Sequence, residues 1–261
     1  MKLKTGLLFC ALWLTALCPQ FALAASSVLV WPVYQVIEAD QQGSALWLEN
    51  RGSYPVSLQV RVLGWQQQDQ RDRYADQQDV IASPPFATVE PGKRQLIRLM
   101  RTVTVPAGRE QSYRIVIDEL PGSLPKEMQE HAGLQLQMRY LLPLFLDGEG
   151  LWTQERTDRK RDASTATRPQ LSWTFSQREG KTWLTVRNQG VVHARLSNVF
   201  WGSSNKPEQA SLRLSEGFLG YVLPGQKMSF PLPAKRQPSG GQTLYAQLAD
   251  NTTPVAIQAA N

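Results

Sequence analysis

Hydrophobic side chains recur mainly at every second position along this chain, which is the period of a β-strand. Turn residues such as Arg51-Gly52-Ser53 and Glu90-Pro91-Gly92 separate the alternating runs. About seven short strands in roughly 120 residues are typical of an immunoglobulin-like β-sandwich, so we expect an all-β domain over residues 25–150. Its main strands are predicted over Val28 to Ile37, Ala45 to Asn50, Val56 to Trp65, Arg94 to Met100, Ser112 to Leu120 and Leu134 to Leu146.

The pattern breaks off after this region and then resumes. Residues 153–168 carry almost no apolar side chain and several charges of both signs, which predicts a solvated interdomain connection over 151–168. Beyond it we expect a second, smaller β-sandwich over residues 169–261. Its predicted strands are Leu171 to Phe175, Thr182 to Asn188, Ala194 to Phe200, Phe218 to Leu223, Met228 to Leu232, Leu244 to Ala249 and Val255 to Ile257.

The first 24 residues have a separate character. Lys2 and Lys4 precede an apolar run, and the segment closes on Ala22-Leu23-Ala24, as in a secretory signal peptide. The apolar run is too short to span a bilayer, which takes about 20 residues, so cleavage is favoured over an uncleaved anchor. We expect no membrane insertion after cleavage, because no other long apolar stretch follows.

Composition narrows the class of protein further. Hydrophobic residues make up 42% of the 261 residues and charged residues 19%, which favours a packed core over disorder. Both cysteines, Cys10 and Cys18, would leave with the signal, so the mature chain would use no disulfide. Removal of two lysines leaves 26 basic against 22 acidic residues, and this mild excess does not indicate nucleic-acid binding.

The chain offers few residues for catalysis. His131 and His193 are its only imidazoles, and both are predicted to lie at the surface. There is no HExxH motif, no GxSxG motif and no glycine-rich phosphate loop. Asp118 and Glu119 are neighbours on a predicted strand, so their carboxylates would point to opposite faces. We therefore expect no enzyme, no cofactor and no metal site.

The tryptophans favour a structural interpretation as well. Because they lie within strand patterns, we interpret them as core residues and not as a platform for sugars. The residues concerned are Trp31, Trp47, Trp65, Trp173 and Trp183.

The segment Gly133 to Leu146 has an unusual pattern. Its odd positions begin polar and become apolar at Leu141, and Pro143 lacks the N–H that a central strand needs, which favours an edge strand or a bulge. An apolar edge strand aggregates unless something covers it. The segment is therefore either an ordinary core strand or a strand that lends one face to another protein. Its even positions are all apolar: Leu134, Leu136, Met138, Tyr140, Leu142, Leu144 and Leu146.

Several motifs give the chain a family resemblance. Pro84-Pro85 is followed by Val89-Glu90-Pro91-Gly92, and Arg109-Glu110-Gln111-Ser112-Tyr113-Arg114 leads into Ile117-Asp118-Glu119-Leu120-Pro121 and then into the alternating strand. With these motifs the mature chain resembles periplasmic pilus-assembly chaperones of the chaperone–usher pathway, of a divergent archaic or spore-coat-protein-like branch.

The resemblance implies two immunoglobulin-like domains set at an angle, with a subunit-binding cleft between them. The strand over 134–146 would donate alternate side chains to a pilus subunit that lacks its final strand, a known form of β-strand addition. The chaperone would act in the periplasm, without a cofactor, and deliver subunits to an outer-membrane usher. The implied donor residues are Leu134, Leu136, Met138, Tyr140 and Leu142, flanked by Val30 and Tyr34 of the first strand.

One departure from the family concerns the anchor for the subunit's C-terminal carboxylate. Better-known members use an Arg of the first strand and a Lys of the donor strand, whereas Tyr34 or Gln35 and Pro143 stand near those places here. Another cation would have to serve, and each candidate has a simpler interpretation as a solvated strand charge. The candidates are Arg98, Arg114 and Arg139.

Two other functions remain open at this point. The chain could itself be a pilus subunit or adhesin, or it could be a secreted carbohydrate-active or carbohydrate-binding β-sandwich protein, which only the tryptophan content favours. A self-capping oligomer would also protect an exposed donor strand.

Overall fold

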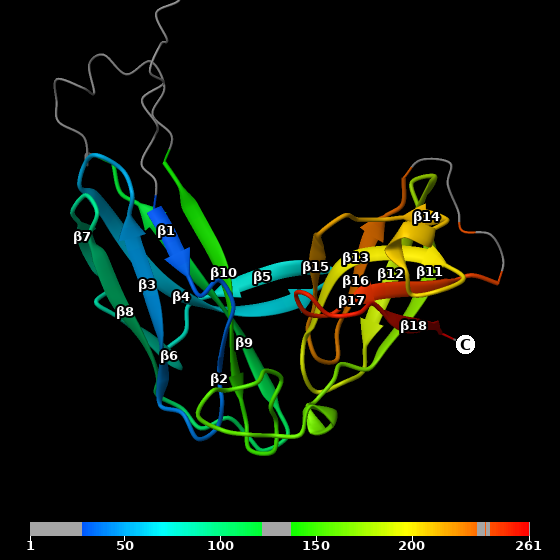
Figure 1. Ribbon diagram of the computed structural model, residues 1–261, viewed down its shortest axis with the longest axis horizontal. Helices are drawn as coiled ribbons and strands as arrows, with labels where there is room; N and C mark the ends of the chain where they lie inside the picture. The colour runs from blue at the N-terminus through cyan, green and yellow to red at the C-terminus, as the bar shows by residue number, and fades with distance from the viewer. Residues whose placement is uncertain (1–27, 122–136, 234–237, 239–240, 261) are drawn as a thin grey trace, which may run out of the picture.

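The computed structural model describes residues 28–121, 137–233, 238 and 241–260. Apart from two single-turn 3-10 helices, its regular elements are all β-strands. They form two β-sandwich domains that stand apart at an angle, joined near the base (Figure 1). No helix within these ranges is long and apolar enough to cross a membrane.

The first domain consists of two sheets packed face to face. One sheet has the order β1-β3-β8-β6, and the other has the order β2-β10-β9-β4-β5, with β7 paired to β4. Alternate residues such as Leu46 and Leu48, or Ile115 and Ile117, are fully buried between the sheets, which explains the period-two pattern. The strands are β1 (Val28–Trp31), β2 (Gln35–Ile37), β3 (Gly43–Asn50), β4 (Val56–Gln68), β5 (Arg71–Ala75), β6 (Val80–Ser83), β7 (Phe86–Val89), β8 (Arg94–Arg101), β9 (Glu110–Glu119) and β10 (Arg139–Asp147).

The prediction of one continuous strand from Val28 to Ile37 was wrong. The chain leaves the first sheet after Trp31, where β1 pairs with β3, and enters the second sheet at Gln35, where β2 pairs in parallel with β10. Pro32 has no N–H and cannot continue the ladder of β1. Side chains alternate in the same way in both short strands, so the sequence pattern did not reveal the change of sheet.

The second domain is a sandwich formed by one sheet that curls around its own core. Its strand order is β14-β13-β17-β18-β11-β12-β16, with β15 paired to β13. Leu184, Leu196, Trp201 and Leu244 are fully buried inside it. The elements are η2 (Ala163–Thr165), β11 (Leu171–Arg178), β12 (Lys181–Asn188), β13 (Ala194–Gly202), η3 (Pro207–Gln209), β14 (Leu212–Arg213), β15 (Phe218–Val222), β16 (Lys227–Pro231), β17 (Thr243–Gln247) and β18 (Val255–Ala259).

The sequence led us to expect a solvated loop for the interdomain connection, but the structure holds this segment by ion pairs to the first domain. Arg156 Nη1 lies 2.7 Å from Asp40 Oδ1, and Arg159 contacts the other oxygen of Asp40 at 2.7 Å. Arg161 Nη1 donates to Glu38 Oε1 at 2.9 Å. The side chains of Arg156 and Arg161 are only 15% and 12% exposed. These ion pairs hold the connection against the end of β2.

Not all of the tryptophans occupy the core. Trp65 is buried, but Trp31 and Trp47 stack on the outer face of the first sheet, with ring centroids 6.4 Å apart and planes 14° apart. The guanidinium of Arg94 lies 5.4 Å from the Trp31 ring. The core prediction was wrong for this pair because β3 buries Leu46 and Leu48 on the opposite face.

Candidate functional site

The first part of β10 forms an open sheet edge. β10 pairs with β9 from Arg139 to Asp147, whereas among the described residues its other side is paired only with β2, at Leu144 to Leu146. Glu119 N donates to Met138 O at 3.0 Å, and backbone groups alternate sides along a strand. The N–H groups of Arg139 and Leu141 therefore point to the open edge. Pro143, the next residue that faces this edge, has no N–H group. The edge position predicted from Pro143 is confirmed.

Burial along the inner face of β10 decreases toward the open end. Leu144 and Leu146 are fully buried, whereas Tyr140 and Leu142 are half-buried and pack against the margin of the core. Met138 is 42% exposed. The row of apolar side chains that fills the core at Leu144 and Leu146 thus continues along β10 to Met138, which lies beyond the core.

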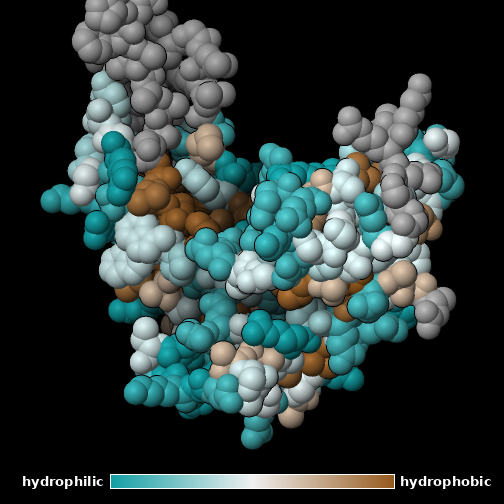
Figure 2. Space-filling model, turned by 45° about the vertical axis from the view of Figure 1, so that its right-hand side comes forward, coloured by the Kyte–Doolittle hydropathy of each residue, from teal (hydrophilic) through white to brown (hydrophobic). Residues whose placement is uncertain are grey.

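The first strand borders this opening. Tyr140 donates its hydroxyl to Val28 O at 2.7 Å, so β1 lies next to β10 although the two belong to different sheets. Val28 and Val30 are nearly buried, at 7% and 6% exposure. Figure 2 shows a hydrophobic surface on the first domain beside the hollow between the domains. Leu134, Leu136 and His131 lie outside the described residues.

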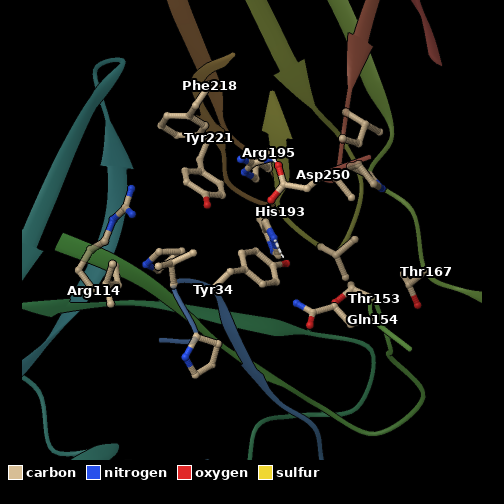
Figure 3. A pocket seen from close by; sticks show the side chains of 18 of the residues that line it. Tyr34, Arg114, Thr153, Gln154, Thr167, His193, Arg195, Phe218, Tyr221 and Asp250 are labelled. Carbon is tan, nitrogen blue, oxygen red and sulfur yellow. Dashed lines mark hydrogen bonds and ion pairs between the residues drawn. The ribbon is translucent and has the colours of Figure 1, made fainter. Parts of the chain in front are cut away.

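A cavity of about 530 Å³ lies between the two domains (Figure 3). The first domain contributes side chains from β9, β10 and the segment before β2, and the second domain contributes β13 and β15. Its lining includes Tyr34, Arg114, Leu141, His193, Arg195 and Tyr221.

Arg114 is the candidate cation that the structure places in this cavity. It is 7% exposed, its guanidinium carbon lies 3.6 Å from the Trp65 ring and 5.1 Å from the Tyr221 ring, and its Nε has no hydrogen-bond partner among the described residues. Burial lowers the pKa of Arg114, against the opposing influence of Tyr74 and Tyr221, but an arginine stays charged in a protein. Arg114 is therefore a buried cation held by aromatic faces.

The other two candidate cations do not reach the cavity. Arg139 points away and pairs with Asp118, which also binds Arg61 Nη2 at 2.7 Å. Arg98 lies exposed on β8, in the other sheet from Arg114 on β9. Consecutive strands of a β-sandwich commonly belong to different sheets, so the sequence neighbourhood of Arg98 and Arg114 did not bring them together.

His193 is buried and not at the surface, contrary to the sequence prediction. It is 6% exposed and stacks on Phe145, with ring centroids 3.5 Å apart. Its backbone N donates to Glu110 Oε1 at 3.0 Å, and its Nδ1 lies 2.8 Å from Glu110 Oε2. The Tyr34 hydroxyl lies 2.6 Å from its Nε2. His193 thus joins the second domain to the first at the base of the cleft.

A hairpin makes a second connection between the domains. β4 and β5 extend from the first domain toward the second (Figure 1). Near the tip, buried Gln67 donates to Tyr221 O at 3.0 Å and accepts from Leu223 N at 2.9 Å. The sequence pattern did not point to Gln67 and Tyr221, because the contact between them joins residues 154 positions apart in the chain. It did not point to Arg195 either, whose contacts with Asp250 and Phe218 lie in other elements of the second domain.

Among the described residues, no group of three or more His, Cys, Asp or Glu side chains could hold a metal ion. The cleft therefore offers aromatic, apolar and cationic side chains for binding, together with an open strand edge.

Comparisons with known proteins agree with this arrangement. Residues 31–151 match the family model "Pili and flagellar-assembly chaperone, PapD N-terminal domain". Over 135 residues the chain is 27% identical to the chaperone protein FimB/FhaD of Bordetella pertussis, a match that covers 49% of this chain and 53% of that protein. The chain thus spans about half the length of this curated relative.

Solved structures extend the similarity to both domains. A chain of the CsuC–CsuE chaperone–tip adhesion subunit pre-assembly complex, from the archaic chaperone–usher Csu pili of Acinetobacter baumannii, is 29% identical, with a TM-score of 0.71. The match covers 90% of this chain and all of that one. A chain of the Salmonella enterica SafA pilin–SafB chaperone complex has the same fold, at 16% identity and a TM-score of 0.60, with 90% and 97% coverage.

The fold and the family match define the class: this chain has the two-domain β-sandwich fold of pilus-assembly chaperones. Its first domain, over residues 31–151, matches the PapD N-terminal domain family of pili and flagellar-assembly chaperones. The class predicted from the sequence motifs is confirmed, and it is a class of chaperones and not of enzymes.

Proposed function

We propose that this protein is a periplasmic chaperone that binds pilus subunits by donor-strand complementation and delivers them to an outer-membrane usher. The observation that carries the proposal is the open edge of β10 over Arg139 to Pro143. It combines N–H groups that have no partner strand among the described residues with an apolar row that extends beyond the domain's own core.

A subunit that lacks its final strand would pair with the N–H groups of this edge and would cover its apolar row. Its backbone would pair with the N–H groups of Arg139 and Leu141, while Met138, Tyr140 and Leu142 would enter its open core together with Leu134 and Leu136. Burying a large apolar side chain contributes about 1.5–3 kcal/mol, so a few such residues suffice for stable binding. Binding of this kind requires no cofactor.

Arg114 is the proposed anchor for the subunit's C-terminal carboxylate. It is a buried cation that lines the cavity beside β10, and its Nε has no partner among the described residues. A carboxylate would supply that partner and a counter-charge, and charge-assisted hydrogen bonds are about twice as strong as neutral ones. Val30 of β1 and Tyr34, in the segment before β2, would flank the bound chain.

The localisation follows from the predicted signal peptide over residues 1–24 and from the class of protein. Delivery to the usher is proposed from the same class. The named complex from Acinetobacter pairs a chaperone with a tip subunit, which supports a pilus subunit as the partner here.

The test is a mild pull-down of the tagged protein from a periplasmic extract of its own source, with mass spectrometry of the co-eluting chains. We expect a small β-rich secreted partner in near-stoichiometric amount. Leu136→Glu combined with Met138→Glu should abolish its recovery and leave the free protein folded.

Val255→Glu is a matched control, because Val255 is 44% exposed on β18 of the second domain. It should retain the partner. A protein that elutes alone, or a Leu136/Met138 double variant that still recovers the partner, would contradict donor-strand binding.

A further inference from the structure

A second cation lines the cavity from the opposite domain. Arg195 of β13 is 20% exposed, and its guanidinium carbon lies 5.5 Å from the Phe218 ring. Among the described residues, three arginines line the cavity, Arg114, Arg168 and Arg195, against the single carboxylate of Asp250. The cavity therefore has an excess of positive charge, contributed by both domains and the connection.

Arg195 is only loosely neutralised. Its Nη1 lies 2.7 Å from Asp250 Oδ1, yet this buried nitrogen has no hydrogen-bond partner of good geometry among the described residues. Asp250 is 76% exposed in the turn between β17 and β18. Solvent weakens an ion pair whose carboxylate is exposed, so a better-aligned carboxylate could replace Asp250 at little cost.

Tyr221 connects the two cations. Its ring faces Arg114 at 5.1 Å, and both Arg114 and Arg195 counteract the rise in its pKa that burial causes. Figure 3 shows Tyr221 between Arg114 on one side and Arg195 with Asp250 on the other. A carboxylate that enters beside Tyr221 would therefore meet a cation from each domain.

We propose that Arg195 is the second cation of a carboxylate site that spans both domains, and that Asp250 occupies Arg195 until a carboxylate ligand displaces it. The inference rests on the proposed function, in which the ligand is the C-terminal carboxylate of a bound subunit. It assigns half of the anchor to the second domain, so closure of the site depends on the angle between the domains.

The test uses N-acetyl-phenylalanine as the probe, because apolar and aromatic side chains line the cavity, and N-acetyl-phenylalaninamide as its uncharged match. Binding is measured by NMR titration, with the side-chain Nε–Hε signals of the arginines observed at low ionic strength. The unaltered protein should bind the acid more tightly than the amide. Arg195→Gln should weaken binding of the acid about tenfold and leave the amide unchanged.

Asp250→Asn is the decisive variant, because Asp250 is exposed and its replacement should leave the protein folded. It should strengthen binding of the acid about two- to fivefold, as expected for removal of an exposed competing carboxylate. Asp76→Asn, at an exposed carboxylate outside the cavity lining, is the control and should change nothing.

The inference is overturned if Arg195→Gln binds the acid as the unaltered protein does, or if Asp250→Asn gives no gain. If Arg114→Gln abolishes binding of the acid and Arg195→Gln does not, Arg114 remains the proposed anchor and the proposed role of Arg195 is wrong. Donor-strand binding is tested separately by the double variant at Leu136 and Met138. A failure of the proposed function can therefore be told apart from a failure of the Arg195 proposal.

Discussion

Asp147 is a buried carboxylate at the end of β10, and neither of its oxygens has a hydrogen-bond partner among the described residues. Burial raises its pKa from 3.8 to about 8, with further contributions from Glu110 and Glu38, while Arg101 acts in the opposite direction. The neutral acid is therefore the main form at pH 7. A buried acid of this kind is tolerated because it does not have to carry a charge.

This raised pKa makes stability depend on pH. The native state binds a proton that the unfolded state releases between about pH 4 and pH 8, so the contribution of Asp147 is complete below pH 4 and is lost as the pH rises through 8. We expect Asp147→Asn to flatten the fall in unfolding free energy between pH 5 and pH 8.5, measured by urea denaturation.

Asp76→Asn serves again as the exposed control and should give a curve parallel to that of the unaltered protein. Equal slopes for all three proteins would show that Asp147 titrates normally.

Single residues show where sequence reasoning ends. Arg114 was one of three equivalent candidates in the sequence, and only its contacts with Trp65 and Tyr221 distinguish it from Arg98 and Arg139. His193 looked like a surface residue because its partners, Glu110 and Tyr34, are 83 and 159 positions away. Local patterns carry no information on contacts at such separations.

At the scale of elements, β10 is a strand with two parts. Leu144 and Leu146 belong to the core of their own domain, whereas Met138 is exposed at the open edge. One alternating pattern runs through both parts, since a strand that completes its own core and a strand that completes a partner's core need the same spacing of apolar residues.

Mutations in the two parts of β10 should have different effects on stability and on subunit binding. Leu144→Ala should lower the free energy of unfolding by about 2–5 kcal/mol, because it leaves a cavity in a fully buried position. Met138→Ala should change it by less than about 0.5 kcal/mol and instead weaken subunit recovery. Both values come from urea denaturation of the free protein.

A large loss of stability in Met138→Ala would mean that the residue belongs to an ordinary core strand, the alternative that the sequence left open.

Most strands could be predicted because alternation reports burial of one face. The predicted strands did not include β5, β6, β7 or β14. In β5 all five residues are exposed, so it has no apolar alternation to detect. The change of sheet at Pro32 was missed for the opposite reason, because alternation continues across it. The residues of the connection were recognised, but their ion pairs with Glu38 and Asp40 were not, since charge patterns do not specify partners.

At the scale of the whole molecule, the angle between the domains is set by a few polar contacts around a buried aromatic cluster. Glu110 holds His193, Gln67 binds the backbone at Tyr221 and Leu223, and Trp65, Phe145 and Tyr221 pack between them. The sequence resemblance implied two angled domains, but it contained no sign of which residues fix the angle.

Glu110→Ala should loosen this junction. It removes two hydrogen bonds from His193 to a carboxylate, each worth about 1.5–3 kcal/mol, and leaves the buried imidazole without them. We expect a larger radius of gyration in small-angle X-ray scattering and earlier unfolding of the second domain in calorimetry.

Glu155→Ala changes an exposed acid of the connection and is the matched control. Unchanged scattering in Glu110→Ala would show that the hairpin and the aromatic cluster hold the domains without His193.

The central claim is that a subunit pairs with the open edge of β10, and amide hydrogen exchange of the free and subunit-bound protein tests it most directly. The account predicts fast exchange at Arg139 and Leu141 in the free protein and strong protection of these two amides in the complex, with little change at Leu144 to Leu146. A stable complex in which Arg139 and Leu141 exchange as fast as in the free protein would contradict it.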